Sequence, residues 1–89
     1  MGKRIVGVRV RAEVDEWTER GAVDFVQAKA EVEVNGVLQW LRSGGLGGVG
    51  EDVAEVKAEQ LQELRLIMAE LGFTYGEIAA AFADVKDEI

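Results

Sequence analysis

The dipeptide Asn35-Gly36 lies between two stretches of alternating apolar and polar residues, and it constrains the fold more than any other feature. Both residue types tolerate the positive φ angles of a type I′ turn, which connects two antiparallel strands tightly. Valine and alanine alternate with polar residues from about Ala22 to Val34, and an apolar stretch from Val37 to Arg42 follows the turn. The sequence therefore predicts a β-hairpin over these two segments.

A further strand is predicted before the hairpin, from Ile5 to Val14. Strict alternation over this segment is typical of a strand with one buried face, because successive side chains point to opposite sides. Asp15 to Gly21 is polar and indicates a connection. The expected buried residues are Val6, Val8, Val10, Ala12 and Val14.

Two helices are predicted in the second half of the chain. Asp52 is a suitable N-cap for an amphipathic helix that ends at Gly72. Thr74 and Glu77 form a capping-box pattern for a second helix, and we expect Asp84 to Ile89 to fray at its end. The predicted fold class is α+β, a three-stranded antiparallel meander followed by two helices packed on one face (β-β-β-α-α).

Composition limits the chemistry of the chain. Its 89 residues predict a single α+β domain over 1–89, and they include no cysteine and no histidine. Thiol catalysis, thiolate metal sites and the commonest general base are thereby excluded. We expect no enzyme activity, no cofactor and no metal, and the sequence contains no membrane-spanning stretch or signal peptide, so we expect a cytoplasmic protein.

A glycine-rich segment, Ser43 to Gly50, separates the hairpin from the first helix. It literally contains G-x-G-x-x-G, which binds dinucleotide phosphates in βαβ folds. Here the preceding strand belongs to a hairpin, and acidic Glu51 and Asp52 stand where a phosphate would lie. We interpret the segment as a flexible crossover from the sheet to the helix.

Two surfaces are candidates for partner binding. The net charge of −7 resides entirely in residues 43–89, and five carboxylates there form an electrostatic candidate: Glu51, Asp52, Glu55, Glu59 and Glu63. Such a stripe is either an ordinary solvated face or a site for a basic surface.

The second surface is apolar. If the hairpin has a two-residue turn, one sheet face without helices carries four large residues, with Ile5 beside them: Val23, Phe25, Leu38 and Trp40. Exposed patches of this kind mark interfaces. A one-residue register slip or a bulge would instead place Trp40 under the helix.

The segment over about 28–80 resembles a family of small phage and mobile-element proteins. Members carry Val-Asn-Gly, then Ser-Gly-Gly-Leu-Trp-Gly-Ile-Glu-Ser-Asp, then an acidic helix. The chain matches in its helix 59–72 and departs at Gly47, where the family has Trp, and at Gly50, where it has Glu. The other matching positions are Ser43, Gly44, Gly45, Leu46, Gly48 and Asp52.

These observations predict a non-enzymatic phage or mobile-element protein that binds a host macromolecular complex. The expected partner is a host protein or protein–nucleic-acid complex with a basic surface, and the expected role is inhibition of a defence system such as CRISPR–Cas. The alternatives are a structural subunit that dimerises through the sheet face, and a transcriptional regulator. Because the acidic half repels phosphates, we expect no direct binding of nucleic acid. We also expect no membrane association, since no apolar run is long enough to span a bilayer.

Overall fold

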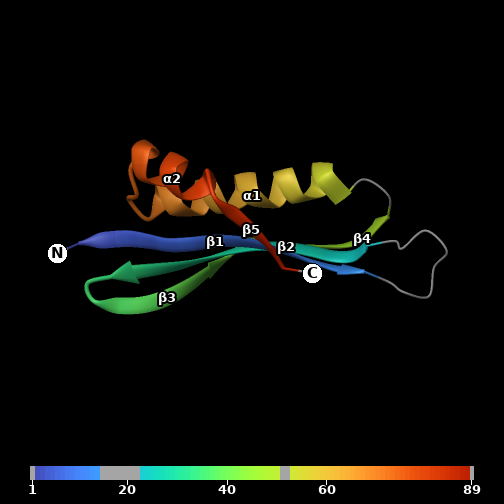
Figure 1. Ribbon diagram of the computed structural model, residues 1–89, viewed down its shortest axis with the longest axis horizontal. Coiled ribbons are helices and arrows are strands. Elements are labelled where there is room, and N and C mark those ends of the chain that lie inside the picture. The colour runs from blue at the N-terminus through green and yellow to red at the C-terminus, as the bar shows by residue number, and fades with distance from the viewer. Residues whose placement is uncertain (1, 15–22, 51–52, 89) are drawn as a thin grey trace.

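The computed structural model describes residues 2–14, 23–50 and 53–88, and within them the chain forms a mixed sheet and two helices. Both helices lie on the same side of the sheet (Figure 1). The elements are β1 (Lys3–Val14), β2 (Val23–Val34), β3 (Val37–Arg42), β4 (Leu46–Gly50), α1 (Val53–Glu70), α2 (Tyr75–Phe82) and β5 (Val85–Glu88).

The sheet has the order β3-β2-β1-β5, and β4 pairs with the same edge of β2 as β3 does. Strands β1 to β4 pair antiparallel, whereas β5 runs parallel to β1. The α+β class is therefore confirmed. The predicted meander is present as β1-β2-β3, but it is part of a larger mixed sheet.

The Asn35-Gly36 turn is confirmed. Asn35 and Gly36 have φ angles of 53° and 81°, as a type I′ turn requires, and Val34 pairs with Val37. No register shift interrupts β2 and β3 beyond the turn. The local signal thus sets the face on which every β3 side chain lies.

The first strand departs from strict alternation at Val6. Ile5 pairs with Val32 and Gly7 pairs with Glu31, so Val6 is an extra residue in a β-bulge. Val6 was predicted to be buried, but it is exposed, and Ile5 packs against the core instead of lying with Phe25 on the other face. Alternation alone cannot reveal a bulge because it assumes one residue per pairing position.

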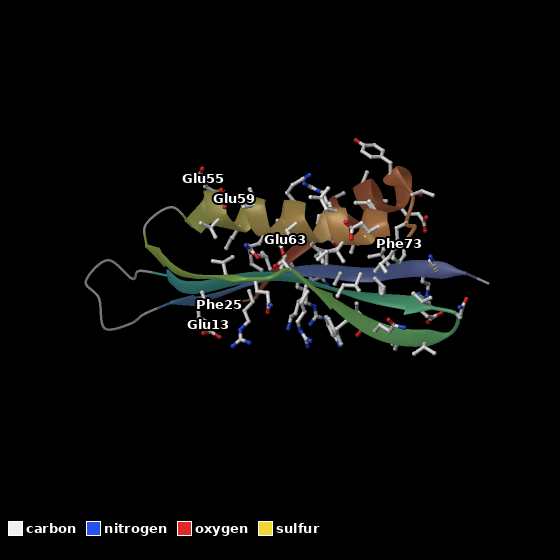
Figure 2. All side chains as sticks on the ribbon, turned by 180° about the vertical axis from the view of Figure 1, so that it is seen from behind. Glu13, Phe25, Glu55, Glu59, Glu63 and Phe73 are labelled. Atoms are coloured by element: carbon white, nitrogen blue, oxygen red, sulfur yellow. The ribbon has the colours of Figure 1, made fainter. Side chains whose placement is uncertain are left out.

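The core lies between the sheet and the helices. Valines and alanines of β1 and β2 contact Leu64 and Met68 of α1, both fully buried, and Phe73 closes the core beside α2. Figure 2 shows Phe73 on the helix side of the sheet. The buried strand residues are Val8, Val10, Ala12, Val26, Ala28, Ala30 and Val32.

Two segments that were predicted to lack regular structure contain strands. Asp84 to Ile89 was expected to fray, yet Val85–Glu88 forms β5, Val85 packs against the core and Lys57 pairs with Asp87 at 3.2 Å. The glycine-rich segment was expected to be a loop, yet Leu46–Gly50 is strand β4. In both cases a strand edge already present elsewhere in the fold supplies the backbone partners.

Candidate functional site

The candidate site is the face of the sheet that carries no helix, which we call the open face. Figure 2 shows Glu13 and Phe25 on this side, away from α1 and α2. Residues directly opposite one another in paired strands project to the same face. The register therefore defines which side chains meet there.

Four cations form a row across the open face. Arg9 of β1 pairs with Lys29 of β2, which pairs with Arg42 of β3, and Lys86 of β5 pairs with Arg9 on the other side. We call Lys86, Arg9, Lys29 and Arg42 the cation row. It crosses three strand spacings, about 14 Å at the usual separation of paired strands. It concentrates positive charge in a chain whose net charge is −7.

Trp40 lies beside this row. Its ring centroid is 5.3 Å from Lys29 Nζ and 5.8 Å from Arg9 Cζ, distances at which a cation is attracted to the π face. Its side chain is nevertheless well exposed to solvent, at 42% for the residue. An aromatic ring next to fixed cations can stack on a planar group while the cations hold an anion.

Carboxylates border the row on both sides. Glu33 bonds Arg4 at 3.0 Å, which raises the pKa of the Arg4 guanidinium, and Glu13 pairs with Arg11 at 2.7 Å. Glu31 lies opposite Trp40 in the register. The ion pairs of Arg4 with Glu33 and of Arg11 with Glu13 offset the charge of the two arginines that flank the row on β1.

The predicted apolar patch is brought together only in part. Leu38 and Trp40 are exposed on β3, so the alternative in which Trp40 packs under the helix is wrong. Phe25 is half-buried, and the side chain of Val23 lies outside the described part of the structure. The remaining apolar surface is therefore concentrated on β3.

Phe25 has a structural role that limits its availability. Its ring covers Gly45, where an added Cβ would lie 2.7 Å from the ring carbon Cζ, and Gly45 has a φ of 78°. Both the close approach and the left-handed backbone favour glycine. Phe25 therefore helps to fix the conformation of residues 43–45, the break between β3 and β4.

Sequence reasoning missed a polar network that fixes this break. Buried Ser43 donates from Oγ to Gln60 Oε1 at 2.6 Å and accepts from the Ala28 backbone at 2.9 Å. Gly45 N also donates to Gln60 Oε1, at 2.9 Å. The sequence signal was the spacing of Gln60, four residues after Val56 and four before Leu64, which puts it on the apolar face of the helix. A polar group buried there must find hydrogen-bond partners.

The acidic stripe is not one continuous binding surface in the structure. Glu51 and Asp52 lie outside the described residues, whereas Glu55 and Glu59 are exposed at the start of α1. Glu63 accepts a hydrogen bond from Gly44 N at 2.7 Å. Figure 2 shows Glu55 and Glu59 on the side of α1 away from the sheet. One member of the stripe therefore supports the fold locally.

An open groove of about 500 Å³ lies between the two helices. Leu66 of α1 and Tyr75 of α2 border it, and Tyr75 is 88% exposed. Arg65 and Phe82 also line it, and Arg65 Cζ lies 4.6 Å from the centroid of the Phe82 ring. The groove is largely apolar, and within the described residues no group of carboxylates is placed to hold a metal ion there or elsewhere.

No helix in the described ranges is both long and apolar enough to cross a membrane. Comparison with protein-family models, with curated proteins and with solved structures gives no match. The resemblance to phage proteins therefore stays a prediction, and function has to be argued from the surfaces.

Proposed function

We propose that this protein is a non-enzymatic binding protein whose open face holds single-stranded nucleic acid. In this proposal the phosphates contact the cation row and a base stacks on Trp40. The observation that carries the proposal is the alignment of Lys86, Arg9, Lys29 and Arg42 beside an exposed tryptophan.

The chemistry of single strands fits this surface. Proteins that bind single strands combine cations along the backbone with aromatic rings on which bases stack, each stack contributing about 1–3 kcal/mol. Trp40 offers such a ring on a sheet without deep walls. A duplex presents its bases stacked inside, so a flat face with one exposed ring suits an unpaired strand better.

The proposal differs from the expectation that nucleic acid is not bound. That expectation counted charges along the sequence, where residues 43–89 are strongly acidic. Lys86 comes from this acidic half, and strand pairing places it next to Arg9. At physiological ionic strength charges more than about 8 Å apart are largely screened. A phosphate bound at the row is therefore influenced mainly by the charges next to it and not by the net charge of the chain.

Fluorescence anisotropy with a labelled single-stranded oligonucleotide at low salt tests the proposal. Arg42→Ala and Lys86→Ala each remove one cation of the row, and we expect the double variant to bind at least tenfold more weakly. Arg65→Ala is the matched control, since Arg65 lies on the helix side over Phe82. Absence of binding at low salt, or an equal loss in the control, would refute the proposal.

A second candidate is the host complex predicted from the sequence, with inhibition of a defence system as its role. The exposed Glu55 and Glu59 on α1 and the resemblance to phage proteins favour it. Here the acidic helix surface would contact a basic protein surface. Affinity capture from host lysate with wild type and with Glu59→Lys would test it, since recovery of one stoichiometric partner should depend on this charge.

A further inference from the structure

Strand β3 forms an outer edge of the sheet and carries backbone groups that face away from β2. Ser43 N donates to Ala28 O at 2.9 Å, which sets the alternation of the antiparallel ladder. Counting back from Ser43, the residues whose backbone N–H and C=O groups point outward are Leu38, Trp40 and Arg42. Among the strands that the structure describes, β2 alone pairs with β3.

This edge lacks the usual protection against pairing. Natural edge strands carry charges, proline or bulges that discourage a second strand. The segment Val37 to Leu41 reads VLQWL, and its pairing with β2 contains no bulge. Val37 and Leu38 are each 58% exposed. The opposite edge, β5, is shorter and carries Lys86 and Asp87.

We propose that β3 pairs antiparallel with β3 of a second copy, about a two-fold axis that passes through Gln39. In this register Leu38 lies opposite the partner's Trp40, and Val37 lies opposite the partner's Leu41. Outward-bonding residues then meet outward-bonding residues, as an antiparallel ladder requires. Each apolar side chain of β3 gains an apolar neighbour across the new interface.

The neighbouring registers are less complementary. An axis at Trp40 places charged Arg42 opposite the partner's Leu38, and an axis at Leu38 places Trp40 opposite the partner's Gly36. The Gln39 axis sets Arg42 opposite the partner's Gly36. The two cation rows therefore end on opposite sides of the axis, and no cation faces another directly.

Edge pairing also differs from the face-to-face dimer predicted as an alternative from the sequence. Stacking two open faces would bring their cation rows toward each other in a poorly hydrated layer, which is unfavourable. Edge pairing leaves both open faces in solvent. A six-residue strand buries less than the roughly 1,200 Å² of a standard interface, so the dimer is expected to be weak and concentration-dependent.

A cross-linking experiment tests the register. Gln39 and the partner's Gln39 form a non-hydrogen-bonded pair with Cα atoms about 4.5 Å apart, within the range that a disulfide spans. The natural chain has no cysteine, so Gln39→Cys introduces a single thiol. We expect it to form disulfide dimers at least tenfold faster than Val37→Cys or the exposed Tyr75→Cys. Equal rates for the three variants would overturn the proposal.

Sedimentation analysis at rising protein concentration tests the interface without a disulfide. Wild type should self-associate, Leu38→Lys should stay monomeric and Leu66→Lys, an exposed leucine on α1, should behave as wild type. A wild type that is monomeric at millimolar concentration would overturn the proposal. It would do so even if β3 pairs with a strand of another protein, because the proposed partner is a second copy of this chain. Dissociation by Leu66→Lys would equally overturn it. The proposal stands independently of nucleic-acid binding, which is measured at concentrations where the protein is monomeric.

Discussion

Gly45 is a position where one methyl group is expected to disturb both a turn and a packed ring. Its φ of 78° costs a non-glycine residue about 1–2 kcal/mol, and the added Cβ would also press on Phe25. We expect Gly45→Ala to lower the free energy of unfolding by about 2 kcal/mol or more, measured by urea denaturation.

Gly76 provides the matched control for this substitution. It lies in α2, and a Cβ there meets no atom within 4 Å. Gly76→Ala should therefore stabilise the protein by about 0.5–1 kcal/mol, because alanine loses less backbone entropy in a helix. A similar loss in both variants would show that Gly45 has no special role.

The stability of the segment around Gly45 also depends on one buried polar atom, the side-chain oxygen of Gln60. Its Oε1 accepts from Ser43 Oγ and from Gly45 N. Gln60→Leu keeps the approximate volume but leaves these donors without an acceptor, so unfolding should become easier by about 1–3 kcal/mol. Gln62→Leu, on an exposed position of the same helix, should change stability little. Equal effects in the two variants would contradict this role of the network.

At the scale of elements, local signals predicted the structure well and non-local pairings were missed. The Asn35-Gly36 turn and the Thr74 cap each depend on residues within a few positions, and both are present. The Val6 bulge and strand β5 depend on what β1 meets across the sheet. The cation row has the same origin, since its members are up to 77 positions apart (residues 9 to 86) and register alone joins them.

The capping box of α2 gives a prediction about pH. The backbone N–H of Thr74 donates to Glu77 Oε1 at 3.0 Å, and this bond, followed by the Thr74 side chain, lowers the pKa of Glu77. A lowered pKa in the folded state means that ionised Glu77 adds stability above its unfolded pKa. This contribution is lost as pH falls through the lower folded value.

Glu77→Gln keeps a side-chain acceptor at the cap but cannot titrate. Its stability should therefore lack this part of the acid dependence, measured by urea denaturation across the titration range of carboxylates. Thr74→Ser should retain it, because serine keeps both the backbone N–H that bonds the Glu77 carboxylate and the hydroxyl that caps the helix. An unchanged pH profile in Glu77→Gln would show that the cap does not couple folding to this carboxylate.

The two candidate surfaces lie on opposite layers of the molecule. The cation row and Trp40 lie on the open face, while Glu55 and Glu59 lie on the opposite layer, exposed on α1. Dimerisation through β3 would leave both open faces accessible and place the two Trp40 rings near the axis. A single strand could then contact both cation rows, so binding to longer oligonucleotides would favour the dimer.

Salt dependence provides the most direct measure of how many cations of this layer contact phosphate. If all four cations of the row contact phosphates, the logarithm of the association constant should fall with the logarithm of salt concentration with a slope of about −3. Removing Arg42 should reduce the slope by about 0.7, whereas Trp40→Leu should weaken binding with little change in slope, because stacking releases no counterion. Anisotropy titrations from 20 to about 200 mM salt would separate these two effects. A slope near zero in the wild type would show that the row does not contact phosphate, and a changed slope in Arg65→Ala would place the contact on the helices instead.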